Sequence, residues 1–168
     1  VEERWENYVA TMHGRDFVTE YTLAATKDGK LTHCRARVQA AMGAYLQLVT
    51  PGIPLLGAFL YAGVYELPAA YDFECTSVFT TMTPTDAYRG AGRPEAAYLV
   101  GPLVDGAARL TPLSPHEIRR RNFIPRAAMP YRTPIGPTYD CGDFPAIFEK
   151  ALKGARYGDT ESRQALGR

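Results

Sequence analysis

The sequence predicts an α+β fold, mixed α/β in character, in which an antiparallel hairpin and one further strand pack with several helices. Three observations support this prediction. Apolar residues alternate along residues 17–26 and 31–42, and a Lys27-Asp28-Gly29-Lys30 turn signal separates the two segments. From Pro94 onward, apolar residues recur at helical spacing. The order of these segments does not match the regular strand–helix alternation of a doubly wound sheet.

The second predicted strand has two distinct faces. Small and apolar residues alternate with polar ones, so that one face is expected to be buried and the other exposed. The apolar face consists of Cys34, Ala36, Val38 and Ala40, and the polar face of Arg35, Arg37 and Gln39.

Three further elements follow the hairpin. Residues 53–63 are apolar on all sides, so we expect a short buried helix there. Residues 71–81 alternate again and predict a third strand. After a loop over residues 84–93, Pro94 stands at a favourable first helical position, and the helix should run to about Leu110.

The C-terminal part begins with Ser114-Pro115-His116-Glu117, which has the cap serine, first-turn proline and third-position glutamate of a capping box. This motif predicts a short helix to about Phe123. A Pro-rich strap should follow, and then helices over residues 144–155 and 160–166. We expect the core of the domain to span about residues 1–124, with the strap and C-terminal helices over about 125–168.

Composition excludes several classes of protein. The 168 residues are 46% hydrophobic and 22% charged, with a net charge of +1 from 19 basic and 18 acidic residues, so nothing indicates a nucleic-acid partner. No apolar run reaches the roughly 18 residues that span a membrane. Three widely spaced cysteines argue against a disulfide framework and favour a cytoplasmic location. The chain opens on Val1 and ends in a polar segment, and we expect both ends to continue in a longer polypeptide.

The main candidate site is the segment Ala-Tyr-Arg-Gly-Ala-Gly-Arg-Pro-Glu over residues 87–95. Gly90 and Gly92 allow tight turning and close approach of a ligand. The segment leads into a helix N-terminus, where free N–H groups and the helix dipole favour negative charge. Arg89 and Arg93 are four residues apart and could strengthen this field. Two interpretations remain open: a cradle for an oxo group, phosphate or carboxylate, or a well-capped helix with solvent-facing arginines.

Other polar groups give weaker signals. His13, His33 and His116 have no Cys, Asp or Glu at metal-binding spacing, so neither a metal site nor a catalytic histidine is indicated. The run Arg119-Arg120-Arg121 favours a solvated or salt-bridged helix face over a site for a phosphate tail or a partner subunit.

Residues 83–96, which read TPTDAYRGAGRPEA, resemble the active-site loop of the molybdopterin-binding large subunit in the xanthine dehydrogenase, aldehyde oxidase and carbon monoxide dehydrogenase family. The loop is a specific signature, and the resemblance extends over nearly the whole chain. Four supporting segments occur in the order of the family, namely Glu3–Tyr8, His13–Asp16, Gly43–Tyr45 and Arg119–Pro125.

The resemblance implies a molybdenum–molybdopterin cofactor, in bacteria commonly in the cytosine dinucleotide form, which hydroxylates a substrate with oxygen from water. It implies that the backbone of Arg89, Gly90 and Ala91 approaches the oxo ligand of the cofactor and that Arg89 acts at the reacting centre. Tyr88 and the side chain of Ala91 would line the substrate pocket. The implied partners are an iron–sulfur small subunit and an FAD-binding medium subunit in an oligomer, without nucleic acid or a membrane span.

Two positions depart from the patterns of well-known members. Gly90 stands where carbon-monoxide-oxidising members carry a copper-binding cysteine, and glycine cannot ligate a metal. Ala91 stands where xanthine-oxidising members carry a purine-stacking phenylalanine, and residues 55–58 lack the expected purine-binding arginine. An aldehyde or heteroaromatic substrate therefore remains. The glycine-rich cofactor motif and the segment with the family's catalytic glutamate are not in this chain, so we expect it to be inactive alone.

These observations leave two hypotheses about the kind of protein to which the chain belongs. The chain is an internal piece of a molybdenum hydroxylase large subunit, or it is a non-catalytic fragment that assembles with a partner. A carbon monoxide dehydrogenase-like protein without the loop cysteine is a further alternative. In-frame continuation of the coding DNA on both sides favours the first hypothesis, whereas flanking start and stop codons favour the second.

Overall fold

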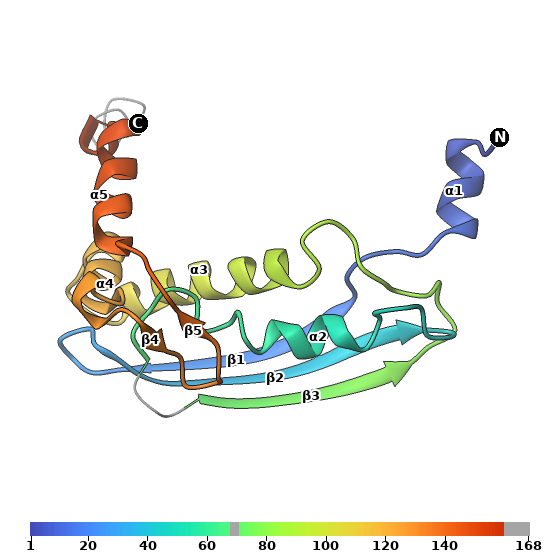
Figure 1. Cartoon of the computed structure of the whole chain (residues 1–168), viewed down its shortest axis with the longest axis horizontal. Coiled ribbons are helices and arrows are strands. Elements are labelled where there is room, and N and C mark those ends of the chain that lie inside the picture. The colour runs from blue at the N-terminus through green and yellow to red at the C-terminus, as the bar shows by residue number, and fades with distance from the viewer. Residues whose placement is uncertain (68–70, 160–168) are drawn as a thin grey trace.

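The computed structural model describes residues 1–67 and 71–159, and it has the predicted α+β architecture. A three-stranded sheet, in the order β1-β2-β3, forms one layer. Helices α2 and α3 cover one face of the sheet (Figure 1). The core lies between the two layers, where Val38 and Met42 of the sheet cluster with Tyr61 and Ala96.

The predicted hairpin is confirmed. β1 (Phe17–Ala25) pairs antiparallel with β2 (Leu31–Gly43), with Tyr21 opposite Ala36. The turn is possible because Gly29 has φ +82°, a conformation that glycine adopts without penalty. The predicted faces of β2 are also observed, since every apolar residue from Cys34 to Ala40 on that face is at most 1% exposed.

The third strand, β3 (Tyr71–Phe79), lies parallel to β2, so the chain between them crosses over the sheet. This crossover contains α2 (Gly52–Gly57). The expected buried helix over residues 53–63 is wrong in two respects. The helix is shorter, and Leu55 and Leu56 are 53% and 52% exposed. A single short helix presents only one side to the sheet, so apolar composition on all sides does not by itself bury the outer side.

The long helix α3 (Arg93–Arg109) runs from the candidate loop along the sheet and continues through Pro102. Its residues Val104 and Ala108 are buried in a second cluster with Leu31 of β2. α4 (Pro115–Asn122) begins with the predicted capping box, in which the amide of Glu117 donates to the Ser114 side chain and the Glu117 carboxylate accepts from the Ser114 amide.

Four short elements were not predicted. Helix α1 (Arg4–Ala10) and the two-residue strands β4 (Tyr131–Arg132) and β5 (Thr138–Tyr139) are too short to give a strong periodic signal. A short 3₁₀ helix, Arg126–Ala128, precedes β4. α5 (Phe144–Gly154) is observed as predicted, whereas the helix predicted over residues 160–166 lies outside the described residues.

Helices α1 and α5 project from opposite ends of the molecule, on the side of the sheet that carries α2 and α3 (Figure 1). Neither helix has a buried residue. In the described part of the chain, no helix has both the length and the apolar character needed to cross a membrane.

Candidate functional site

The candidate loop is held in place by hydrogen bonds at its base. His13 and Thr85 form an isolated parallel bridge, in which the His13 amide donates to the Pro84 carbonyl (3.0 Å) and the Asp86 amide to the His13 carbonyl (2.9 Å). The Thr85 hydroxyl donates to the carbonyl of Ala41 at the end of β2 (2.8 Å). The N-terminal segment and the sheet therefore both fix the point at which the loop starts.

Three consecutive loop residues have left-handed backbone conformations, with φ of +99° at Gly90, +42° at Ala91 and +96° at Gly92. The Ala91 amide donates to the Tyr88 carbonyl (2.8 Å) and the Arg93 amide to the Gly90 carbonyl (3.1 Å). Within the described residues, the amides of Gly90 and Gly92 have no such acceptor. A non-glycine residue such as Ala91 costs about 1–2 kcal/mol in this conformation, so the surrounding structure must enforce it.

Space also disfavours a side chain at both glycines, more strongly at Gly90. A Cβ atom at Gly90 would lie 2.8 and 2.9 Å from Cδ and Cγ of the Pro94 ring. A Cβ atom at Gly92 would lie 3.1 Å from the Ile53 carbonyl oxygen of α2. The loop thus packs closely on the first turn of α3 and on α2.

Arg15 is a further residue of the site, which the sequence motif did not predict. Its Nη2 donates to the Arg89 carbonyl (2.9 Å), its Nε lies 3.0 Å from Glu95 Oε1, and its guanidinium lies 5.4 Å from the centre of the Tyr88 ring. Gly14 allows the chain at Arg15 to come this close to Tyr88, because a Cβ atom at position 14 would lie 2.6 Å from Tyr88 Cβ. The only signal in the sequence was the position of Arg15 inside the His13–Asp16 segment that supports the family resemblance.

Two buried polar atoms lie behind the loop. The Glu95 side chain is only 10% exposed, and its Oε2 has no hydrogen-bond partner. The hydroxyl of Tyr61 is likewise buried without a partner. Burial, and secondarily the nearby Glu95 carboxylate, raises the pKa of Tyr61 to about 12, so this phenol stays protonated at neutral pH.

The structure brings the predicted site residues together in one exposed turn. Tyr88 is 66% exposed, the Arg89 side chain also faces solvent, and Gly90 and Ala91 are half-buried. The guanidinium of Arg93 comes within 3.5 Å of the Gly90 carbonyl oxygen. With Arg15 paired to Glu95, the arginines of the loop leave a net positive charge around its free amides, which suits a negatively charged ligand.

The other polar candidates have structural partners. Arg119 pairs with Asp105 (2.5 Å), and Arg120 holds Glu149 through two hydrogen bonds (2.5 and 3.0 Å), as expected for a salt-bridged helix face. Within residues 1–67 and 71–159, no group of three His, Cys, Asp or Glu side chains could hold a metal ion.

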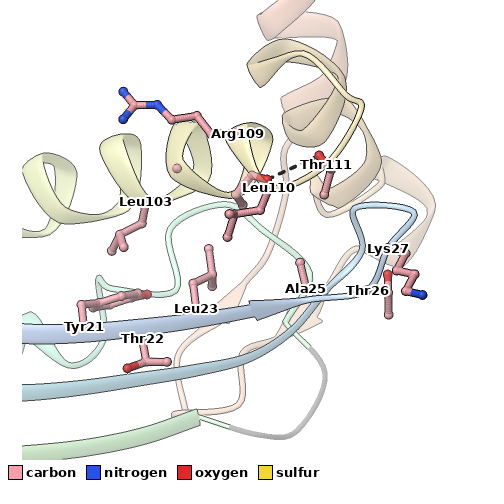
Figure 2. Close-up of a pocket in the computed structure, with 12 residues that line it drawn as sticks. Tyr21, Thr22, Leu23, Ala25, Thr26, Lys27, Leu103, Arg109, Leu110 and Thr111 are labelled. Atoms are coloured by element: carbon pink, nitrogen blue, oxygen red, sulfur yellow. Dashed lines mark hydrogen bonds between the residues drawn. The ribbon is translucent and has the colours of Figure 1, made fainter.

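An open groove of about 610 Å³ lies away from the loop, between β1 and the C-terminal half of α3. Figure 2 shows that Leu103 and Leu110 face Tyr21 and Leu23 across it, whereas the guanidinium of Arg109 points away. A separate hollow of about 430 Å³ lies beside the loop, between α1 and the ring of Tyr88.

These features define an α+β domain with a turn of unpaired backbone amides at the start of its longest helix. Residues 1–123 match the model of the molybdopterin cofactor-binding domain, and the chain belongs to this family. The chain is 36% identical to the carbon monoxide dehydrogenase large chain of Hydrogenophaga pseudoflava, over 100% of this chain and 21% of that one. It is 30% identical to the gamma subunit of the 6-hydroxypseudooxynicotine dehydrogenase complex of Paenarthrobacter nicotinovorans, over 94% and 20% respectively.

The crystal structure of quinoline 2-oxidoreductase from Pseudomonas putida 86 is also similar, with a TM-score of 0.90 and 31% identity over 100% of this chain and 22% of that one. The structural similarity, like the sequence similarity, thus extends over the whole of this chain. The chain spans about a fifth of the length of these relatives.

Proposed function

We propose that this chain is the loop-bearing part of a molybdenum hydroxylase large subunit, which oxidises an aldehyde or heteroaromatic substrate with oxygen from water. The observation that carries the proposal is the left-handed turn at Gly90–Gly92, whose unpaired amides lie at the start of α3. In the complete subunit, the cofactor supplies the oxygen-transfer and two-electron chemistry, and the protein supplies positioning and electrostatics.

The residues present fit such a cofactor. Free backbone amides at a helix N-terminus bind anionic oxygen without a side-chain ligand, and the turn is glycine-rich enough for a bulky group to approach it. No side-chain cluster for a bare metal exists in the described residues, which agrees with a metal carried by an organic ligand. We assign the backbone of Arg89, Gly90 and Ala91 to the cofactor, in its cytosine dinucleotide form.

The side chains of the turn then act on the substrate side. Arg89 is charged and exposed, and it would stabilise negative charge that develops at the reacting centre. Tyr88 offers an exposed aromatic face to a flat substrate. Ala91 leaves room beside it, where a larger side chain would fill the pocket.

Carbon monoxide is a less suitable substrate, although a carbon monoxide dehydrogenase is among the relatives. A copper-binding cysteine cannot replace Gly90 without a collision, because its Cβ would lie 2.8 Å from the Pro94 ring. A heteroaromatic substrate agrees better with the relatives named for quinoline and 6-hydroxypseudooxynicotine.

Several parts of the active complex must come from elsewhere. The catalytic base of the family has no assigned residue here, so this chain alone should be inactive. We propose that the complete subunit assembles with an iron–sulfur subunit and an FAD-binding subunit in an oligomer. We also propose a cytoplasmic location, which the three unpaired cysteines support.

The proposal is tested by expressing the complete reading frame in a host that makes molybdenum cofactors. Molybdenum and released cytidine nucleotide are measured in the purified complex, and quinoline-type compounds, aromatic aldehydes, xanthine and carbon monoxide are assayed in ¹⁸O-labelled water. We expect molybdenum, and labelled product from one of the first two classes. A complex that contains no molybdenum and oxidises none of the four would overturn the proposal.

The role of Arg89 has its own test. Arg89→Ala in the complete enzyme should lower turnover by on the order of a hundredfold, as the loss of one preorganised charged contact does. Unchanged turnover would remove this side chain from the reacting centre and leave only its backbone there.

A further inference from the structure

We infer that Arg15 is a positioning residue of the candidate loop, which sets the direction of the peptide between Arg89 and Gly90; this role rests on the proposed function. Arg15 lies 74 positions before Arg89 in the sequence, yet its guanidinium donates to the Arg89 carbonyl at 2.9 Å. The same guanidinium pairs with Glu95 on the other side of the turn and lies 5.4 Å from the centre of the Tyr88 ring. The Arg15 side chain therefore contacts Tyr88 and Arg89 near the start of the loop and Glu95 at its end.

The effect on the loop follows from the planarity of the peptide bond. In a trans peptide, the carbonyl and the N–H group of the next residue point in opposite directions. When Arg15 holds the Arg89 carbonyl, it turns the Gly90 N–H away from itself. That N–H is one of the amides without an acceptor in the described residues, so the clamp aims an unused donor outward to where a ligand would bind.

The clamp itself is held from two sides. The bridge between His13 and Thr85 fixes the backbone two residues before Arg15, and Arg15 has a left-handed φ of +61°. Among the described non-glycine residues, only Arg15, Ala91 and Arg156 have a positive φ, and two of these three meet at this loop. Backbone strain is kept where the surrounding structure enforces a functional geometry.

Glu95 supplies the second support. Its side chain is 10% exposed, and its Oε1 lies 3.0 Å from Arg15 Nε in an ion pair, while Oε2 is buried without a partner. A carboxylate buried in this way needs its cation, so the ion pair orients the guanidinium as well as balancing the charge. The planar fork of arginine can serve the carboxylate and the carbonyl together, whereas a lysine ammonium on its flexible stem cannot hold both in one fixed geometry.

The test uses the complete subunit in its complex, with Arg15→Lys, Arg15→Gln, and Arg15→Gln combined with Glu95→Gln. Arg35→Gln is the control, since Arg35 is exposed on β2, away from the loop. Three quantities are measured: the thermal midpoint, hydrogen exchange at the Ala91 and Arg93 amides, which close the turn, and kcat and KM separately.

The double variant separates positioning from stability. Arg15→Gln alone leaves Glu95 buried without its cation and should lower the thermal midpoint, and the added Glu95→Gln should restore it. If Arg15 positions the loop, the double variant still shows faster exchange at both amides and a kcat lower by roughly tenfold to a hundredfold. Arg15→Lys should retain the midpoint and show the same loss of exchange protection.

The outcomes of this test are distinct. Recovery of both exchange protection and kcat in the double variant would show a purely structural ion pair and overturn the inference. Unaltered exchange in all Arg15 variants of a molybdenum-containing, active complex would overturn it as well, while leaving the proposed function intact. Absence of molybdenum from the wild-type complex overturns the proposed function instead.

Discussion

Replacing Gly90 by cysteine tests whether the geometry of the loop excludes a metal-ligating side chain. The position has φ +99°, and a non-glycine residue in such a conformation costs about 1–3 kcal/mol. The new Cβ would also lie 2.8 and 2.9 Å from two atoms of the Pro94 ring, which is rigid and cannot move aside as a flexible side chain would. Such overpacking adds about 1–3 kcal/mol. We therefore expect Gly90→Cys to lower the free energy of unfolding by about 2–5 kcal/mol, within the sum of these two ranges.

The measurement is equilibrium urea unfolding of the chain, followed by far-UV circular dichroism. Gly90→Cys combined with Pro94→Ala removes the ring contact but keeps the backbone strain, so it should recover about half of the loss. Gly101→Ala is the control, because nothing lies within 4 Å of its added Cβ and the helix interior gains roughly 0.5–1 kcal/mol from the change. A Gly90→Cys variant as stable as the wild type, or one that oxidises carbon monoxide in the complete enzyme after copper addition, would refute the reasoning.

Two further predictions concern the core. The side chain of Asn122 is fully buried; it accepts a hydrogen bond from the Leu31 amide (2.8 Å) and donates one to the Gly29 carbonyl (2.7 Å). Asn122→Leu leaves both backbone groups unpaired, so it should lower the free energy of unfolding in urea by about 2–5 kcal/mol. A loss below about 1 kcal/mol would contradict this prediction. Burial raises the pKa of Cys34 from 9.0 to about 11, so its contribution to stability is present below pH 9 and is lost as the pH rises through 11. Unfolding midpoints between pH 8 and 11 should fall less steeply for Cys34→Ala than for the wild type, and equal slopes would exclude the thiol as the cause.

The sheet and the long helices could be predicted because their signals are local. The Lys27–Lys30 turn and the alternation along β2 determine the hairpin through residues that are close in sequence. The capping box at Ser114 likewise needs only four consecutive residues. The strands β4 and β5 also pair with residues close in sequence, Tyr131 with Tyr139, but two residues carry no periodicity from which to predict a strand.

The predicted buried helix illustrates a different limit. The pattern of residues 53–63 correctly showed that the segment is apolar, but exposure depends on what covers it. Ile53 and Pro54 pack against the rest of the chain, while Leu55 and Leu56 on the same short helix face outward. Hydrophobic composition indicates which residues can be buried, but how much of a short helix is buried depends on how many other elements pack against it.

In the candidate loop, too, some features are visible in the local sequence, and others depend on residues far away in the sequence. Its glycines and its position before a helix proline are visible in nine consecutive residues, and they suffice to predict a turn with free amides. The direction in which one of those amides points depends on Arg15, which belongs to a different segment and has no motif of its own beyond a neighbouring glycine.

These local and distant contacts determine which residues of the loop can vary. If backbone amides hold the cofactor and Arg15 fixes their direction, the side chains at positions 88 and 91 are left to shape the substrate pocket. Neither side chain closes the turn, because its closing bonds run between backbone atoms of Tyr88 and Ala91 and of Gly90 and Arg93. A change at Ala91 therefore leaves the clamp intact, whereas a change at Tyr88 also removes the contact of its ring with the Arg15 guanidinium. Gly90 is the exception, since the Pro94 ring occupies the space that any side chain there would need. Under the proposed function, we therefore expect Tyr88 and Ala91 to determine the choice of substrate, while Arg15, Gly90 and Glu95 keep the geometry on which any substrate depends.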